Sequence, residues 1–327
     1  MADVAQEAGV SGQTVSRVAN GHNNVDADTR ARVLAAMQQL GYRPNSAARA
    51  LRSGRFRSIG VIIFTLSTVG NMRTLEGITV AAAQAGYSIT LMPVAHKTQD
   101  EVSSAFSRLS EQAVDGVIIV IEAHLIDETT FELPSGLPVV VVDSTARDRF
   151  PVVDTDQGQG ARLATDHLLD LGHQTVWHVS GPPESYSAER RRDAWEATLL
   201  EHGAPVPPVL IGDWTTGSGY AHGLELARDP AVTAIFAAND QMALGVLRAL
   251  HEVGRRVPED VSVVGFDDME EAESFWPPLT TVHQSFGTVG SRSVEALLEQ
   301  VEGGTAHHDV LVGTELVVRA STAAPRG

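Results

Sequence analysis

The chain has 327 residues, of which 43% are hydrophobic, so it is long enough for two or three packed units. It has no run of about 18 apolar residues and does not open with a signal peptide, which argues against a membrane-spanning or exported protein and predicts a cytoplasmic one. Because cysteine is absent, disulfides and thiolate metal sites are excluded.

The charge of the chain is distributed unevenly. The formal net charge is −17, which as a total argues against binding to nucleic acid. The first 57 residues, however, hold eight arginines and four carboxylates, a net charge of +4, so the remaining 270 residues carry −21. We therefore expect a small basic head that faces a polyanion and a large acidic body.

The head begins with a pattern typical of two short helices joined by a tight turn. Residues 2–8 have helical spacing, and Gly9 then tolerates the positive φ of a turn. Ser11 is a good N-cap for a second helix, and Val15 and Val18 of that helix would face inward. The pattern predicts a helix-turn-helix unit.

Three polar side chains are left on the outside of the second helix. With the valines buried, Gln13, Thr14 and Arg17 face outward at helical spacing. Gln and Arg are side chains that bond adenine and guanine edges in a major groove. Asp26 predicts the N-cap of a third helix, Gly41 its end, and an apolar stripe runs along it: Val33, Ala36, Met37 and Leu40.

A short arginine-rich segment follows the head. The sequence "YRPNSAARALRSGRFRSIGV" places Leu51 among arginines, on one side of a helix too short to be stable alone in water. An exposed leucine in such a place is the wedge that a minor-groove binder uses to unstack a base step. We expect this hinge to become ordered on DNA.

From Ser58 on, short β-branched runs alternate with helical stretches of about 10 to 15 residues. Continuous apolar strands separated by helices predict parallel sheets that are covered on both faces. The eight runs are too many for one core, so two doubly wound sheets are expected, with a ligand cleft at the strand ends. They are "RSIGVIIF", "YSITLMPV", "DGVIIVI", "LPVVVVD", "TVWHVSG", "PVLIGDW", "TAIFAAND" and "DVSVVGFDD".

Polar side chains follow several of these runs and are candidates for the ligand site. Asp143, Asn239 and Asp267 end buried runs, and Arg191 shares a helix face with Trp195. Carboxylates, an amide and a guanidinium offer donors and acceptors suited to vicinal hydroxyl groups. For the neighbouring acids, a structural role is favoured over a ligand role: Asp240 and Asp268.

The motifs "DVAQEAGVSGQTVSRVANG", "TRARVLAAMQQLGYRPN" and "ARALRSG" resemble the headpiece and hinge of the lactose-repressor (LacI/GalR) family, and the similarity extends to about Thr322. The resemblance implies an α/β protein: a three-helix helix-turn-helix headpiece, a hinge, and a two-lobed, periplasmic-binding-protein-like body of doubly wound parallel sheets. The expected boundaries are 1–44 for the headpiece, 45–57 for the hinge, 58–155 with 286–313 for the N-terminal lobe, and 156–285 with 314–323 for the C-terminal lobe.

Carried over position by position, the resemblance gives a set of DNA-binding residues. Gln13 and Arg17 would read bases, and Gly12 stands where several relatives carry a base-reading side chain. Residues expected mainly on phosphates are Thr14, Ser16, Asn20, Thr29, Tyr42 and Asn45. Residues expected in the minor groove at the operator centre are Ala48, Leu51 and Arg52.

The resemblance also implies an effector site. Its expected residues are Asp143, Ser187, Arg191, Trp214, Asn239, Asp267, Gln284 and Phe286. Val120 departs from the family pattern, because a sugar-binding Asn occupies that position in the lactose repressor. The matching positions favour a galactoside-like sugar, and Val120 indicates that it differs in detail from lactose-type ligands. No cofactor or metal ion is expected.

Two other classes of protein were weighed. The chain lacks GxSxG, P-loop, HExxH and correctly placed GxGxxG motifs, which argues against an enzyme. A transport-type sugar-binding protein would share the body fold, but it would carry a signal peptide in place of the basic residues 1–57.

The sequence thus predicts a transcriptional repressor that a small sugar releases from a palindromic DNA operator. Corepression by a non-sugar ligand, which occurs in the purine-responsive branch of the family, stays open as an alternative. Tetrameric relatives add a leucine-heptad helix after the body, whereas this chain ends in "STAAPRG", so a homodimer is expected. Its interface is expected along residues 242–253 and near residues 257–264.

Overall fold

The computed structural model describes residues 1–19, 24–42, 54–94, 99–120, 136–143, 150–304 and 309–326. The chain divides into two compact units, Met1–Phe56 and Arg57–Gly327, here called the headpiece and the body.

The described residues of the headpiece form three helices, α1 (Ala2–Ala8), α2 (Gly12–Ala19) and α3 (Ala27–Gln39). Gly9 ends α1 with a φ of 63°, the left-handed turn that the sequence predicted. The backbone N–H of Thr14 donates to Ser11 Oγ over 3.2 Å, and Asp26 caps α3 through the N–H of Thr29 at 3.0 Å. Both predicted N-caps are confirmed.

One small core holds the three helices together. Its fully or nearly buried members come from all three: Val4, Ala8, Val15, Val18, Val33, Ala36 and Met37. Leu40, expected in the same stripe, is 45% exposed because α3 ends at Gln39, so this residue leaves the buried face. The burial of Val15 and Val18 fixes which side of α2 faces solvent.

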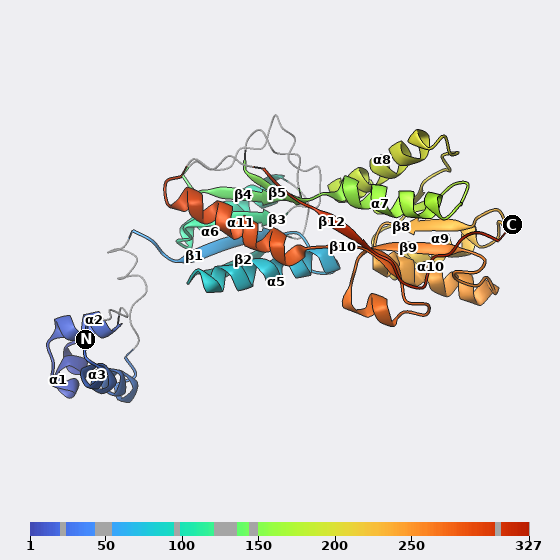
Figure 1. The fold of residues 1–327 in the computed structure, drawn as a ribbon. Helices are drawn as coiled ribbons and strands as arrows, with labels where there is room; N and C mark the ends of the chain where they lie inside the picture. The colour runs from blue at the N-terminus through green and yellow to red at the C-terminus, as the bar shows by residue number, and fades with distance from the viewer. Residues whose placement is uncertain are drawn as a thin grey trace. The chain divides into compact units, whose positions relative to one another are not determined.

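The part of the body that the structure describes forms two six-stranded sheets (Figure 1). The first has the order β11-β5-β4-β3-β1-β2 and its pairings are all parallel. Its strands are β1 (Ser58–Ile63), β2 (Ser88–Pro93), β3 (Gly116–Val120), β4 (Val139–Val142), β5 (Val152–Thr155) and β11 (Val310–Val312). We call this sheet, with the helices that cover it, lobe 1.

The second sheet has the order β12-β10-β9-β8-β6-β7 and is parallel except for the antiparallel pair β10–β12. Its strands are β6 (Trp177–Ser180), β7 (Leu210–Ile211), β8 (Ala234–Ala237), β9 (Ser262–Asp267), β10 (Thr280–Gln284) and β12 (Thr314–Val317). This sheet and its helices form lobe 2.

Helices cover both faces of each sheet (Figure 1). In lobe 1, α5 (Val69–Gln84) and α11 (Phe286–Val301) lie on one face and α6 (Gln99–Glu111) on the other. A Cβ at Gly290 would lie 2.5 Å from the backbone of Gly77, so the close approach of α5 and α11 at this point requires glycine.

In lobe 2, α7 (Gln157–Asp170) and α8 (Tyr186–Glu201) cover one face of the sheet. The other face is covered by α9 (Thr216–Leu226) and α10 (Asp240–Val253), and the short 3-10 helix η1 (Glu270–Ser274) follows β9. Apolar strands with helices on both faces are what the alternating pattern predicted.

Three connections cross between the lobes. They join β5 to α7, β10 to α11, and β11 to β12, the last through Gly313 alone. All eight apolar runs of the sequence form strands, whereas β5, β10, β11 and β12 were not among them.

Part of the expected dimer interface is wrong. Val263 and Val264 of β9, and Val261 just before it, have no exposed surface, because β9 lies between β8 and β10 and helices cover both faces of the sheet. Residues this deep within one chain cannot contact a second copy. Along α10, Leu244 and Val253 are 39% and 49% exposed, so the expectation for that helix stays a prediction.

Candidate functional site

Two of the predicted DNA-binding side chains lie on the solvent face of α2. Gln13 and Arg17 are exposed and one helical turn apart, while Val15 and Val18 of the same helix are buried. Thr14 is half-buried, and its Oγ1 lies 3.0 Å from Ser11 Oγ. A short helix with an amide and a guanidinium on its outer face has the side chains that read base edges.

The other expected headpiece residues are placed less uniformly. Gly12 is exposed, and a Cβ built there meets no atom within 4 Å, so any side chain would extend into solvent. Ser16, Thr29 and Tyr42 are half-buried, and the ring of Tyr42 packs against the headpiece core. Five expected residues lie outside the described part of the chain: Asn20, Asn45, Ala48, Leu51 and Arg52.

A cavity of about 560 Å³, measured with its open mouth, lies between the two lobes of the body. Asp143, at the end of β4, and Phe286, the first residue of α11, line it from lobe 1. The other expected effector residues, placed by lobe 2, line the same cavity: Ser187, Arg191, Trp214, Asn239, Asp267 and Gln284. The structure therefore brings all eight together.

Four side chains form a closed polar ring at the lobe 2 wall. Arg191 Nε donates to Gln157 Oε1 at 2.8 Å, and Gln157 Nε2 donates to Gln284 Oε1 at 3.3 Å. Gln284 Nε2 then donates to Asp267 Oδ1 at 2.6 Å, which lies 3.7 Å from Arg191 Nη1. All four residues are buried, so the low dielectric strengthens each contact.

Arg191 is fixed by aromatic rings as well as by hydrogen bonds. Its guanidinium carbon lies 3.7 Å from the ring centre of Phe266 and 5.6 Å from that of Trp214, and Nη1 donates to the carbonyl of Ala238. Trp214 Nε1 is buried and has no hydrogen-bond partner within the described residues. The cavity wall thus combines aromatic faces with a fixed cation and a donor.

Asn239 has two structural tasks besides lining the cavity. Its Oδ1 accepts the backbone N–H of Met242 at 2.8 Å and so caps α10, while Nδ2 donates to the carbonyl of Trp214 at 3.1 Å. Asn239 is therefore the N-cap of α10, and Asp240 is its first helical residue.

Three cavity residues hold backbone conformations that side chains rarely adopt. The φ angles of Asp143, Trp214 and Asp267 are 60°, 71° and 111°. Each such residue costs about 1–3 kcal/mol, and residues of this kind cluster at ligand sites. The strain at three positions of one cavity supports a binding role for it.

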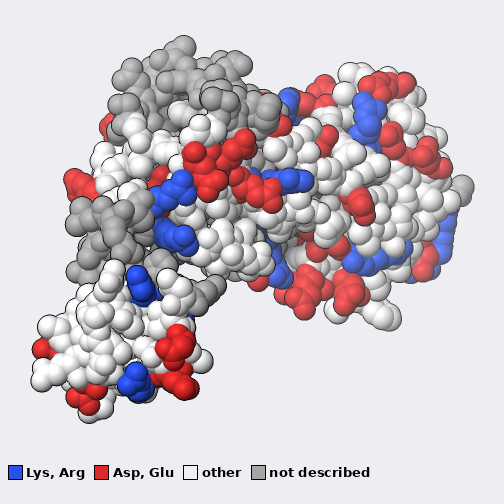
Figure 2. Space-filling model, turned by 60° about the vertical axis from the view of Figure 1, so that its left-hand side comes forward, with Lys and Arg blue, Asp and Glu red and all other residues white. Residues whose placement is uncertain are grey.

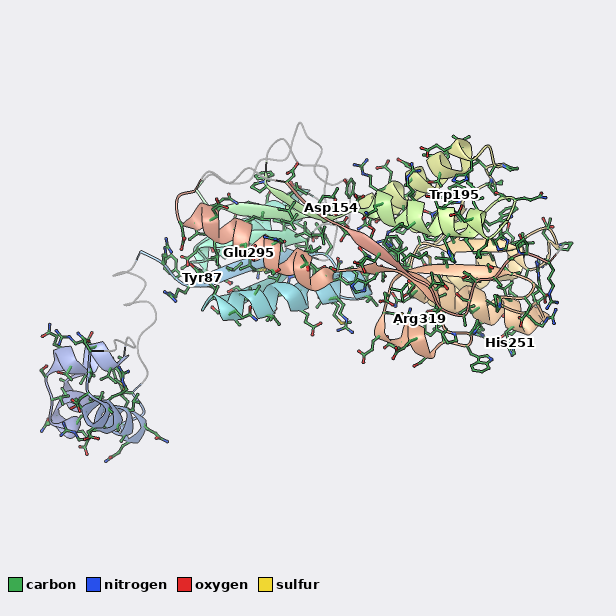
Figure 3. The ribbon with its side chains drawn as sticks, viewed as in Figure 1. Tyr87, Asp154, Trp195, His251, Glu295 and Arg319 are labelled. Carbon is green, nitrogen blue, oxygen red and sulfur yellow. The ribbon has the colours of Figure 1, made fainter. Side chains whose placement is uncertain are left out.

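Several cavity residues were not found from the sequence. Asn71 and Thr74 come from α5, Asp154 and Thr155 from β5, and Gln157 from the start of α7. Asn71 is fixed by its Nδ2 bond to the carbonyl of Thr65 at 3.1 Å. Figure 3 labels Asp154 where lobe 1 meets the crossing segments.

Asp240 and Asp268, expected to be structural, do not line the cavity. Asp240 accepts hydrogen bonds from Thr281 Oγ1 at 2.6 Å and from the N–H of Met269 at 2.8 Å, and burial raises its pKa well above the ordinary range of a carboxyl. Asp268 binds Arg319 Nη2 at 2.7 Å and His283 Nδ1 at 3.0 Å.

Among the described residues, no helix is long and apolar enough to cross a membrane, and no group of three or more His, Asp or Glu side chains is arranged to hold a metal ion. Asp and Glu side chains are spread over the face of the body drawn in Figure 2, as its negative charge requires.

Comparison with known families matches both parts of the chain. Residues 1–45 match the model of bacterial regulatory proteins of the lacI family, and residues 165–322 match a periplasmic binding protein-like domain. A helix-turn-helix headpiece joined to a two-lobed body with a cavity between its lobes defines a class of bacterial transcription regulators.

Relatives cover almost the whole chain. The lactose operon repressor of Escherichia coli is 36% identical over 99% of this chain and 90% of its own length. The transcriptional repressor PurR of Haemophilus influenzae is 34% identical over 98% of this chain and 97% of its own. The chain belongs to the LacI family of transcriptional repressors, and with this family the prediction that it is not an enzyme is confirmed.

Solved structures confirm the predicted fold class. The lac repressor dimer bound to operator and the anti-inducer ONPF has a TM-score of 0.88 at 36% identity, covering 98% of each chain. The complex of the transcriptional regulator CelR with cellobiose has a TM-score of 0.74 at 32% identity, again covering 98% of each chain.

Proposed function

We propose that this LacI-family repressor is a cytoplasmic homodimer that binds a palindromic operator and is released when a small sugar or glycoside occupies the cavity between its lobes. A galactoside-like ligand is favoured. The observation that carries the proposal is the meeting of all eight expected effector residues in one cavity.

The exposed face of α2 supports the DNA-binding part of the proposal. We propose that Gln13 and Arg17, which are exposed, read base edges, and that the half-buried Thr14, Ser16, Thr29 and Tyr42 contact phosphates. One headpiece offers few contacts, so a two-fold dimer that places two α2 helices in successive major grooves doubles them on a palindrome.

The chemistry of the cavity supports a sugar as the effector. A sugar hydroxyl can donate one hydrogen bond and accept two. The cavity supplies carboxylates that accept, a guanidinium that donates and amides that do both. Trp214 adds an aromatic face and the Nε1 donor. The CelR structure that the chain resembles holds cellobiose.

The polar ring offers a route from ligand to DNA. Gln157 begins α7 directly after one crossing segment, and Gln284 ends β10 directly before another. A ligand that binds Arg191 and Asp267 therefore acts on side chains bonded to both crossings. It shifts the lobe arrangement by its difference in affinity for the two states, typically about 1–3 kcal/mol, and DNA must weaken sugar binding by the same factor.

The test begins with selection of duplexes bound by the full-length chain from a random pool. A thermal-shift screen against mono- and disaccharides then identifies ligands, because a ligand at 100 times its Kd adds about 2.7 kcal/mol to stability. We expect an enriched palindrome and at least one sugar that lowers affinity for it. If no duplex is enriched with or without ligands, the proposal is wrong.

The resemblance to PurR makes corepression the second candidate. The two candidates differ in the sign of the effect, since a corepressor raises operator affinity and an inducer lowers it. A purine base added to the same operator assay distinguishes them. Tighter operator binding with the purine, and no effect of any saccharide, would establish corepression.

A further inference from the structure

We propose that Asp240 is a positioning residue: together with Thr281, it clamps the backbone corner that follows β9 and so holds the carboxyl group of Asp267 at the cavity between the lobes. Asp240 itself does not line that cavity. The inference rests on the proposed function, because it gives a role in the ligand site to a residue that does not contact the ligand.

The corner at the end of β9 has a strained backbone. Its two residues, Asp267 and Asp268, have φ angles of 111° and 50°, which residues other than glycine rarely adopt. Asp267 lines the cavity, whereas the carboxylate of Asp268 binds Arg319 Nη2 at 2.7 Å and His283 Nδ1 at 3.0 Å. Strain of this kind persists only where the surrounding structure holds the backbone in place.

Asp240 and Thr281 hold two backbone N–H groups of this corner. The N–H of Met269 donates to Asp240 Oδ2 at 2.8 Å, and the N–H of Asp268 lies 3.4 Å from Thr281 Oγ1. The two side chains are also bonded to each other, with Thr281 Oγ1 2.6 Å from Asp240 Oδ1. The first residue of α10 and a residue of β10 therefore fix the same corner.

The carboxyl group of Asp240 is packed tightly against β9. Asp240 and Thr281 have no exposed surface. A Cβ at Gly265, two residues before Asp267, would overlap Asp240 Oδ1, so the carboxyl group can reach the strand backbone only because this position is glycine. Asp240 is therefore in contact with the strand that ends in Asp267.

No cation compensates the buried carboxyl group of Asp240. Among the described residues it forms no ion pair, and burial and the neighbouring Asp267 raise its pKa well above the ordinary range of a carboxyl. The basic side chains nearby bind Asp267 or Asp268 instead; they are Arg191, Arg319 and His283. We therefore expect Asp240 to hold a proton at neutral pH.

A neutral Asp240 satisfies every contact of the clamp. A proton on Oδ1 reverses the hydrogen bond to Thr281, so that the carboxyl O–H donates and Thr281 Oγ1 accepts it beside the N–H of Asp268. Oδ2 still accepts the N–H of Met269. Asn offers the same pattern, because its NH₂ group donates and its carbonyl oxygen accepts. Asn is thus the conservative substitute for the neutral acid.

Hydrogen exchange, measured by mass spectrometry on the full-length protein, tests the clamp without a ligand. Asp240→Leu keeps a similar shape but neither contact, so we expect the amides of residues 266–275 to exchange at least about tenfold faster. Asp240→Asn keeps both contacts and should retain slow exchange. If exchange in Asp240→Leu equals that of the unsubstituted protein, the clamp is refuted.

Substitutions of Thr281 test the clamp a second time, should Asp240→Leu not fold. Thr281→Val removes the hydroxyl and should give the same faster exchange, whereas Thr281→Ser keeps the hydroxyl and should restore slow exchange. Thr198→Val is the matched control, because Thr198 is also fully buried but its hydroxyl donates to the carbonyl of Ala194 within α8. Equally fast exchange of residues 266–275 in this control would mean a general loss of stability and would contradict the inference.

Calorimetry with lactose and cellobiose tests the role of the clamp in the ligand site. We expect Asp240→Leu and Thr281→Val to bind these sugars at least about tenfold more weakly than the unsubstituted protein, and Thr198→Val to bind within about twofold of it. Faster exchange with unchanged sugar affinity overturns the positioning role.

A crystal structure of Asp240→Leu separates this inference from the proposed function. If the unsubstituted protein binds neither sugar, the proposed function fails for them, but the position of Asp267 still decides the inference. Its Oδ1 lies 2.6 Å from Gln284 Nε2 in the unsubstituted protein, and we expect this hydrogen bond to be lost in the variant. An unmoved Asp267 overturns the inference.

Discussion

Gln157 and Gln284 are hydrogen-bonded where two segments of the chain cross between the lobes, with Nε2 of Gln157 3.3 Å from Oε1 of Gln284. Each also binds one member of the Arg191–Asp267 pair on the cavity wall. The hydrogen bond between the two glutamines therefore links the two crossing segments to each other and to the Arg191–Asp267 pair.

Replacing Gln284 by Leu removes both of its bonds in the ring while keeping a similar volume. Because a buried polar group left without a partner costs about 1–3 kcal/mol, we expect the Kd of the sugar to rise about 10- to 100-fold. The ratio of operator affinities without and with sugar should fall as well. Calorimetry with the sugar and fluorescence anisotropy with the operator measure the two effects.

Gln300→Leu is the control for this change. Gln300 donates to the carbonyl of Val139 at 3.2 Å, a contact within lobe 1. We expect its sugar affinity to match that of the unsubstituted protein. An unchanged sugar affinity in Gln284→Leu would show that the ring does not contribute to the ligand site.

Asn239 allows its two structural tasks to be separated by substitution. Asn239→Asp keeps a good N-cap for α10 but loses the Nδ2 donor to the carbonyl of Trp214, so we expect weakened sugar binding with little change in stability. Asn239→Ala loses both and should lower the free energy of unfolding by about 1–2 kcal/mol. Chemical denaturation and sugar titration of both variants test this; equal stability loss in both would contradict it.

Arg17→Ala tests base reading by α2. We expect a loss of about 1–3 kcal/mol at the selected operator and a relaxed preference at one base pair. Arg32→Ala, on α3, removes the same charge from the headpiece and should weaken binding to operator and scrambled duplex alike. Anisotropy at fixed salt separates the two, and an unchanged operator preference in Arg17→Ala would rule out base reading by this residue.

His178 makes the stability of the body depend on pH. It has no exposed surface and stacks between Trp195 and Phe236, with ring centres 5.2 and 4.7 Å away, and burial lowers its pKa to about 3. Below the unfolded value of about 6.5, the unfolded chain binds a proton that the folded chain does not. The free energy of unfolding should therefore fall by up to about 1.4 kcal/mol per pH unit between about pH 6 and 4.

Denaturant titrations from pH 7.5 to 4.5 measure this slope. Burial also lowers the pKa of His167 and His173, so these residues add to the loss in the same direction. His178→Gln should be less stable at pH 7.5 and have a flatter slope, whereas the exposed His251→Gln should keep the full slope. Identical slopes in both variants would show that His178 binds the same number of protons in the folded and the unfolded chain.

The strands that could be predicted from the sequence differ in residue pattern from those that could not. β3, β4 and β8 are unbroken apolar runs buried on both faces, as is β1 from Ile59 on, and so they are recognisable in the sequence. β10 is also interior, but its sequence is Thr-Thr-Val-His-Gln, which does not look like an apolar strand. Its two threonines can be buried because the hydroxyl groups of Thr280 and Thr281 are hydrogen-bonded. β11 and β12 form one run along the chain, which only the structure divides between two sheets.

The predictable part of the cavity is limited in the same way. Asp143, Asn239 and Asp267 follow recognisable strands, so their convergence could be expected. Asn71 and Thr74 lie on a helix, where polar residues usually face solvent, and only the fold turns them inward. Asp154 belongs to β5, and a search of strand ends cannot include a strand that was not detected.

The connection from β11 to β12 between the lobes consists of Gly313 alone, because Val312 belongs to the lobe 1 sheet and Thr314 to the lobe 2 sheet. Two peptide units span at most about 7 Å, and Gln159 Oε1 accepts from the N–H of Thr314 at 2.7 Å, which fixes one end to α7. This short connection therefore limits how far the two lobes can separate at this point, and a rotation of one lobe against the other would strain it less. If a ligand in the cavity changes the arrangement of the lobes, we expect that change to be mainly a rotation about Gly313.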